Sequence, residues 1–357
     1  MFFKFKSNLH IKLFNQLILF FFLVFFIIPL SGIAQKTEVT AEKGEGIYRL
    51  LTRSGLSVSD YLNSFIELNK NNLGKDNTLI EGEKYILPEK TSSPENNEPA
   101  TAENTEPAKA KGKIMHFDIF GDKYADVEVT SDNLKGAVYY LVSGHGGPDP
   151  GTIGRYLNHD VYEDEIAYDV TLRLARNLIS EGATVYMITR DNNDGIRDEA
   201  YLKLDHDEVC YPNQPIPLNP KKRLAQRTNA VNKLYKQNRG SFQRMIVIHV
   251  DSRSKSENID VFFYHDKRSE TGEKAANILQ KTIQQKYDQH QPGRGYNGSV
   301  SDRNLYVIRN TYPVAVFIEL GNVNHQRDIQ RLIIPDNRQA LANWLDEGLI
   351  ADFKTNK

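Results

Sequence analysis

Residues 138–151 of this chain read VYYLVSGHGGPDPG, and this stretch decides which fold we expect. The run 138–142 contains only aliphatic and aromatic side chains, which is typical of a strand buried on both faces. Three glycines around His145 allow the backbone to turn tightly directly after that strand. Open parallel sheets place their chemistry just beyond the carboxyl ends of their strands. His145 therefore occupies a position where a functional side chain is expected.

Two further segments repeat this arrangement of an apolar run that ends in a polar group. Residues 245–251 read MIVIHVD, and residues 315–321 read AVFIELG. A histidine or a carboxylate at the end of so apolar a strand costs free energy unless it has a partner or a task. His249 and Glu319 therefore join His145 as candidates for one functional site at the edge of a parallel sheet.

The rest of the chain beyond residue 113 alternates strand and helix patterns. Residues 114–129 predict an additional N-terminal β element. Further strands are predicted at 138–142, 184–188, 245–250, 259–264, 305–308 and 314–318, and helices at 163–181, 220–237, 270–287 and 338–353. This alternation predicts an α/β fold with a mostly parallel central sheet and helices on both faces. Residues 192–219 are polar and contain prolines, so we expect an insertion beside the sheet.

Glu163 is the predicted fourth member of the site. The apolar stripe of its helix has a spacing of four residues and runs through Ile166, Val170, Leu174 and Leu178. Extended back by one turn, the stripe reaches position 163, which therefore faces the sheet. Glu165 lies about 200° further around the helix and points away from that face. The alternative for Glu163 is that an acidic residue in a first turn offsets the helix dipole.

Two histidines and one carboxylate, with a water in the fourth position, form a hydrolytic zinc site. We therefore predict that His145, Glu163 and His249 bind Zn²⁺. Glu319 is then expected to be the general base, which takes a proton from the attacking water and passes it to the leaving amine. Asp251 follows His249 on the same side of the strand and is a candidate to hydrogen-bond its ring. A turn histidine at 145 and a core histidine bonded to a backbone carbonyl at 249 are the alternatives.

Taken in order, these motifs resemble those of the zinc-dependent N-acetylmuramoyl-L-alanine amidases, which are cell-wall hydrolases. The resemblance runs from about residue 137 to the C-terminus, through GHGGPDPGTIG at 144–154, TRD at 189–191, Arg227, IH at 248–249, GRG at 293–295, VIRNT at 307–311 and residues 313–321. It implies a phosphorylase/hydrolase-like amidase domain with zinc ligands His145, Glu163 and His249 and the catalytic residue Glu319. It also implies a supporting role for Arg294, which matches an arginine near the active-site face.

The chain departs from the family pattern at three places. Val250 and Asp251 follow the second histidine, where the family usually has a small pair such as Ala-Asn. The spacing between His145 and Glu163 is longer than usual. The long autoinhibitory helix of some division-associated members is missing, because residues 259–265 run almost directly into the next predicted helix. Residues 192–219 are therefore the remaining candidate for a lid or a docking loop.

Residues 36–90 predict a small α+β module. Two helices carry apolar faces, formed by Ile47, Leu50 and Leu51 and by Tyr61, Leu62 and Phe65. Residues 79–88 alternate like an edge strand that ends at a proline. The order strand–helix–helix–strand resembles a LysM domain, which implies binding to N-acetylglucosamine-containing glycans of the cell wall. The match is degenerate, because Gly46 replaces the usual hydroxyl residue and extra residues precede Asn69. A packing module without a ligand is the alternative.

Residues 1–35 have the layout of a secretory signal. Lys4, Lys6 and Lys12 precede an uncharged run at 17–30, and small residues follow. As a helix, this run spans roughly 21 Å against a hydrocarbon core of about 30 Å. We therefore predict cleavage near Gln35 and export to the periplasm or cell envelope. The alternative is that the segment remains as a membrane anchor.

The composition limits the function further. The 357 residues carry a net charge of −1, which lacks the basic excess of a nucleic-acid-binding protein. Residues 91–112 contain three prolines and no apolar periodicity, as in a flexible linker. Cys210 is the single cysteine, so no intrachain disulfide can form. Residues 113–357 then form the catalytic domain, with the insertion at 192–219.

Together these features predict a zinc-dependent peptidoglycan hydrolase. It would cleave the amide bond between N-acetylmuramic acid and the L-alanine of the stem peptide. We expect a monomer that acts on peptidoglycan, binds no nucleic acid, and is regulated, if at all, by an activator protein or a lid at residues 192–219. A non-catalytic peptidoglycan-binding or regulatory protein on an amidase fold is one alternative. Another zinc amide hydrolase, such as a carboxypeptidase, is the second.

Overall fold

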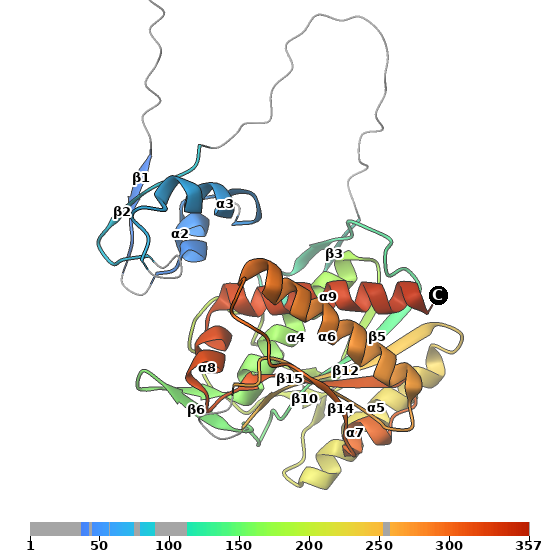
Figure 1. Ribbon diagram of the computed structural model, residues 1–357. Helices are drawn as coiled ribbons and strands as arrows, with labels where there is room; N and C mark the ends of the chain where they lie inside the picture. Colours follow the sequence, from blue (N-terminus) through green and yellow to red (C-terminus); the bar gives the residue numbers. More distant parts are fainter. Residues whose placement is uncertain are drawn as a thin grey trace, which may run out of the picture. The chain divides into compact units, whose positions relative to one another are not determined.

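The computed structural model describes residues 37–42, 45–56, 58–74, 79–89, 113–252 and 258–356. The chain divides into two compact units, Met1–Ala102 and Glu103–Lys357, which are coloured along the sequence in Figure 1. The predicted signal at 1–35 and the predicted linker at 91–112 lie outside the described residues. Within the described part of the chain, no helix is both long enough and apolar enough to span a membrane.

The described residues of the first unit form two helices and a two-stranded sheet. Strand β1 (Glu38–Thr40) pairs antiparallel with β2 (Lys84–Ile86), and α2 (Ile47–Arg53) and α3 (Val58–Asn69) lie between them in the sequence. The buried Asn69 side chain joins α3 to β2, since its amide donates to the carbonyl of Ile86 and accepts the N–H of Ile86. The expected order of strand, helix, helix and strand is present, and the likeness to a LysM domain stays a prediction.

The second unit is built on a six-stranded sheet with the order β14-β13-β15-β12-β5-β8. Its strands are β5 (Ala137–Ser143), β8 (Thr184–Met187), β12 (Phe242–Asp251), β13 (Phe262–His265), β14 (Val300–Asp302) and β15 (Val314–Asn322). Neighbouring strands run parallel except for β13 and β15, which are antiparallel. The predicted mostly parallel sheet is therefore confirmed.

Helices cover both faces of this sheet (Figure 1). One face carries α4 (Glu163–Ser180), α6 (Glu270–His290), α8 (Gln326–Ile333) and α9 (Pro335–Thr355), and the other carries α5 (Pro220–Gln237) and α7 (Tyr306–Arg309). Successive side chains of a strand point to opposite faces. Ile246 and Ile248 accordingly pack in the core under α4, whereas Met245 and Val247 pack in the core under α5.

The structure corrects the predicted strand at residues 305–308. These residues fall almost entirely within the helical turn α7, and the edge-strand position is taken by β14 instead. Val307 and Ile308 are buried against the α5-side core, which one helical turn achieves as well as a short strand. Periodicity cannot separate the two structures in so short an apolar run. Strand β13 also begins later than predicted, after Asp260, whose φ of 55° interrupts an extended chain.

Several small elements flank the central sheet. The hairpin β6 (Ile153–Tyr156) and β7 (His159–Tyr162) leads directly into α4. Residues 192–219 contribute β10 (Val209–Cys210) and β11 (Gln214–Pro215), and β10 pairs with β9 (Thr189–Arg190). The predicted β element at 114–129 contains β3 (Ile114–His116) and β4 (Asp126–Glu128). The insertion is therefore attached to the main body by a strand pairing.

Candidate active site

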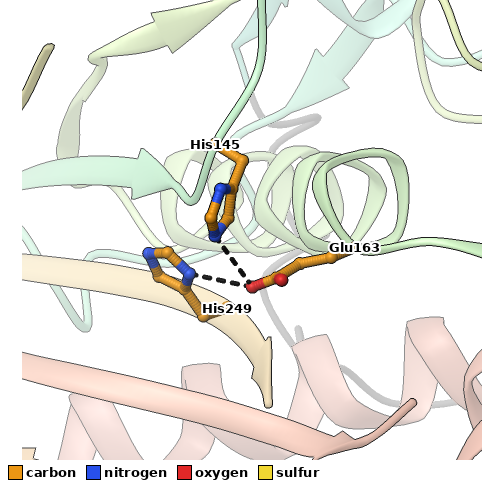
Figure 2. Close-up of side chains that lie close together, drawn as sticks. All are labelled: His145, Glu163 and His249. Carbon is orange, nitrogen blue, oxygen red and sulfur yellow. Dashed lines mark hydrogen bonds and ion pairs between the residues drawn. The ribbon is translucent and has the colours of Figure 1, made fainter. Parts of the chain in front are cut away.

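Three of the predicted site residues meet at the carboxyl ends of β5 and β12 (Figure 2). His145 follows the end of β5, His249 lies near the end of β12, and Glu163 is the first residue of α4. Nδ1 of His249 lies 3.0 Å from Oε1 of Glu163, and Nε2 of His145 lies 3.3 Å from the same oxygen. The donor atoms of the three side chains all lie within 4.8 Å of one another. We call these three residues the trio.

Backbone contacts fix the carboxylate of Glu163 in this position. Its Oε2 accepts the N–H of Thr152 at 2.9 Å, and its Oε1 accepts the N–H of Val250 at 3.2 Å. The backbone N–H of Glu163 in turn donates to the carbonyl of Thr152. The hairpin of β6 and β7, which fills the segment between His145 and Glu163, thus delivers the first turn of α4 to the end of β12.

Two glycines make room for the trio. A Cβ atom at Gly144 would lie 2.4 Å from the ring of His249, and one at Gly151 would lie 2.7 Å from Oε2 of Glu163. Neither distance is compatible with a side chain. His145 itself has a φ of 54°, which is uncommon for a residue other than glycine. Backbone strain of this kind concentrates at functional sites.

The charges of the trio depend on one another. Burial acts to raise the pKa of Glu163, but hydrogen bonds from His145 and His249 outweigh it and lower that pKa. Burial likewise acts to lower the pKa of His145, but hydrogen bonds to Asp149 and Glu163 raise it to about 9. Burial lowers the pKa of His249, although Glu163 opposes this shift. A metal ion would replace the proton on His145, because imidazole coordinates metals in its neutral form.

Asp149 orients His145 and was not singled out from the sequence. Nδ1 of His145 donates to Oδ2 of Asp149 at 2.9 Å, which leaves Nε2 free to face Glu163. Arg223 donates to the same Asp149 oxygen, and the hydrogen bond to His145 lowers the pKa of Asp149 to about 2. A carboxylate that fixes the tautomer of a histidine ligand is a common feature of metal sites. Its position four residues after His145 in the glycine-rich turn was the available signal.

The donor set fits a divalent metal ion. Two imidazole nitrogens and one carboxylate oxygen are the ligands of many hydrolytic zinc sites. The backbone contacts of Glu163 and the space left by Gly144 hold these donors together, and among the described residues no fourth His, Cys, Asp or Glu joins the group. The arrangement can therefore hold a metal with one open position.

Glu319 lies beside the trio on β15. It is paired in register with His249 across the parallel strands β12 and β15. Its side chain is 6% exposed, and its Oε2 is buried without a hydrogen-bond partner among the described residues. Burial raises its pKa well above the usual range, and the negative charges of Asp251 and Glu163 add to this effect. Such a carboxyl group is suited to accept and return a proton.

Asp251 and Arg294 are placed differently from the other predicted residues. Asp251 accepts the N–H of Ser252 at 2.8 Å, and the strand register shifts between His249 and Asp251, which weakens the argument from strand period. Arg294 donates to Asp260 at 2.5 Å and lies 4.5 Å from the centre of the Tyr287 ring. The supporting roles of both residues stay predictions.

Comparison with known proteins places the chain among cell-wall enzymes. A family model described as N-acetylmuramoyl-L-alanine amidase matches residues 140–351, which is more than half of the chain. The chain is similar to "Probable cell wall amidase LytH" of Staphylococcus aureus, with 24% identity over 245 residues that cover 67% of this chain. The match covers 66% of that protein, so the chain spans slightly less than two thirds of its length.

The chain is also similar to two solved structures of N-acetylmuramoyl-L-alanine amidases. The catalytic domain of CwlV from Bacillus (Paenibacillus) polymyxa is 19% identical, with coverage of 61% of this chain and 98% of that one and a TM-score of 0.45. Ami1 from Mycobacterium smegmatis is 16% identical, with coverage of 62% and 99% and a TM-score of 0.45.

Proposed function

The chain belongs to the N-acetylmuramoyl-L-alanine amidase family, and we propose that it cleaves the amide bond between N-acetylmuramic acid and the L-alanine of the peptidoglycan stem peptide. One observation carries this proposal. His145, Glu163 and His249 bring their donor atoms within 4.8 Å of one another, inside the region that the family model matches. Glu319, whose Oε2 has no hydrogen-bond partner among the described residues, is paired in register with His249.

We propose that the trio holds Zn²⁺. Bound there, Zn²⁺ would act as a Lewis acid that polarises the amide carbonyl and increases the acidity of the attacking water. Asp149 keeps the Nδ1 proton on His145 and so directs Nε2 toward the ligand position. Thr152 and Val250 hold the two oxygens of Glu163. These contacts prepare the site before substrate arrives.

Glu319 supplies the proton transfer in this proposal. Its carboxylate takes a proton from the attacking water as the oxygen–carbon bond forms at the lactyl carbonyl. It then gives that proton to the amide nitrogen as the carbon–nitrogen bond breaks, so that the stem peptide leaves with a free L-alanine amine. The raised pKa of Glu319, caused first by burial, favours the first step, because a more basic carboxylate accepts a proton from water more readily.

The cellular setting follows from the same proposal. We propose that residues 1–35 direct the chain to the periplasm or cell envelope, where peptidoglycan is found. Residues 36–90 would bind wall glycans as a LysM-like module, and the protein would act as a monomer. The insertion at 192–219 would be the contact surface for any activator protein.

Mass spectrometry of the products from purified peptidoglycan tests the activity. The zinc-loaded protein is expected to release stem peptides that begin with L-alanine. Glu319→Ala should bind zinc as the parent protein does but release no peptide, whereas His145→Ala should lose both zinc and activity. Asp160→Asn, on the exposed strand β7, is the matched control and should keep both.

Other products would point to the alternatives. Release of the C-terminal amino acid of the stem, with L-alanine still attached to the sugar, would indicate a carboxypeptidase. A protein that sediments with the wall but releases nothing in any form would be a non-catalytic binding protein. Full release by Glu319→Ala would refute the role proposed for that residue.

A further inference from the structure

A second group of carboxylates lies between the first turn of α4 and residues 192–219. Oxygen atoms of Asp164, Glu165 and Glu208 lie within 4.8 Å of one another, and so do oxygen atoms of Asp191, Asp205 and Glu208. Because Glu208 belongs to both groups, the five side chains form one connected set, which we call the carboxylate cluster. None of its members belongs to the trio.

Burial distinguishes the carboxylate cluster from ordinary surface acids. Its members are buried except for Asp205, which is half-buried. Asp164 is only 1% exposed, and its Oδ2 has no hydrogen-bond partner among the described residues. That oxygen belongs to a carboxylate that faces those of Glu165 and Glu208. Buried polar atoms in proteins almost always have a partner, so this oxygen is a place where a bound ion or water would supply one.

The side chains around the carboxylate cluster do not balance the negative charge of its carboxylates. Among the described residues, the ion pairs to the carboxylate cluster come from Arg197, which contacts Glu165 at 2.8 Å and shares its charge with Asp194. The remaining contacts are largely backbone N–H groups, such as that of Gly147 on Glu208 at 2.6 Å. Burial above all, with neighbouring carboxylates in addition, raises the pKa of Glu208 to about 7.

We propose that the carboxylate cluster is a second metal site, which binds Ca²⁺. Calcium takes six to eight oxygen ligands, including carboxylates that bind through one or both oxygens, and it tolerates irregular cages. The cluster offers oxygen atoms alone, whereas zinc prefers the nitrogen donors that the trio provides. The two sites therefore differ in donor chemistry as well as in position, and this inference does not depend on the proposed amidase activity.

The position of the site suggests what the ion does. Glu208 accepts the N–H of Gly147, and Nδ1 of His206 donates to the carbonyl of Gly147 at 2.8 Å. Gly147 lies two residues after His145, and Asp164 directly follows Glu163. Calcium would thus join residues 192–219 to the segments that carry His145 and Glu163, and it would stabilise the insertion against α4.

Calorimetric titration of the full chain with CaCl₂ tests the proposal. The protein is first loaded with zinc, so that the trio is filled, and the zinc content is measured again after the titration. The expected result is one equivalent of calcium per chain, an unchanged zinc content, and a melting temperature that rises with calcium concentration.

Three variants locate the binding. Glu208→Gln removes the residue that both groups share, and Asp205→Asn removes the most exposed ligand, which is the change that folding tolerates best. Each should weaken calcium binding at least about tenfold, because ligand charge sets calcium affinity. Glu199→Gln is the matched control, since Glu199 is an exposed glutamate of the same insertion outside the carboxylate cluster. It should bind calcium with unchanged affinity.

Three results would overturn the proposal. The first is a parent protein that shows neither heat nor a shift in melting temperature with calcium. The second is unchanged calcium affinity in a folded Asp205→Asn variant. The third is release of zinc in proportion to calcium bound, which would place calcium in the trio. None of these measurements uses substrate, so they are independent of the amidase assay.

Discussion

The first turn of α4 supplies neighbouring carboxylates to two unlike environments. Glu163 faces two imidazoles, whose hydrogen bonds outweigh burial and lower its pKa. Asp164, the next residue, faces the carboxylate cluster, where burial and the charges of Glu165 and Glu208 raise its pKa to about 9. Burial and helix position are nearly the same for both residues. The groups that a carboxylate faces therefore decide its charge and the metal that it can bind.

The difference between the two environments is tested most strongly by replacing a glutamate with glutamine at two positions of that turn. Glu163→Gln should abolish stoichiometric zinc binding and reduce peptide release at least about 100-fold, because a neutral amide is a poor metal ligand. Glu165→Gln should keep zinc, since its carboxylate contacts Arg197 and not the histidines. Zinc content by elemental analysis and peptide release by mass spectrometry measure both effects. Loss of zinc in both variants, with circular dichroism unchanged, would contradict the separation of the two sites.

Asp149→Asn is expected to weaken zinc binding by the trio less than Glu163→Gln does. Removing the charged acceptor of the Nδ1 proton loosens the orientation of His145, and such changes typically weaken metal binding about 10- to 100-fold. Competition with a zinc chelator measures the affinity. Activity should recover at saturating zinc, because Glu319 is untouched. A zinc affinity equal to that of the Asp160→Asn control would show that Asp149 has no part in binding.

The positions of the site residues could be predicted from the sequence because each apolar run ends where a functional side chain begins. His145, His249 and Glu319 each follow an apolar run that is typical of a buried strand, and the ends of parallel strands meet at one edge. The helical spacing behind Glu163 then selected it over Glu165. The structure brings the trio together and pairs His249 with Glu319. The metal and the roles of these residues stay predictions.

The carboxylate cluster could not be predicted in the same way. Asp205 and Glu208 lie in a polar segment without strand or helix periodicity, so the sequence does not indicate which surface they meet. Their position depends on the pairing of Cys210 with Thr189, a contact between segments about twenty residues apart. The turn α7 was missed for a related reason, because the apolar run at 305–308 is too short to carry a period.

Because of the carboxylate cluster, the free energy of unfolding of the protein should depend on pH in calcium-free buffer. Glu208 has a pKa of about 7 in the folded protein and a reference value of 4.5. Its contribution to stability is therefore complete below about pH 4.5 and is lost as pH rises through about 7. We expect the unfolding free energy to fall by about 1–2 kcal/mol between pH 6 and 8, after allowance for solvent screening.

Denaturant unfolding at several pH values measures this loss. Glu208→Gln should make the dependence in calcium-free buffer shallower, because the amide cannot ionise. Saturating calcium should reduce it by a similar amount in the parent protein, because the ion compensates the charges. A parent protein whose stability is constant across this range would show that the carboxylate cluster is already neutralised by other means.

Asp346 on α9 provides the control for the effect of calcium on the pH dependence of unfolding. Its substitution has the smallest expected effect on the unfolding free energy. It is 8% exposed, its Oδ1 has no hydrogen-bond partner among the described residues, and burial, with the charges of Glu181 and Glu347, raises its pKa to about 7. Asp346→Asn should therefore stabilise the protein by about 1 kcal/mol at pH 8 and by less at pH 6. Asp346 belongs to neither group of clustered carboxylates, so calcium should leave this difference unchanged. If calcium also removed the stability difference between Asp346→Asn and the parent protein, the ion would be acting by general screening. The distinction between a single buried acid and the metal-binding carboxylate cluster would then fail.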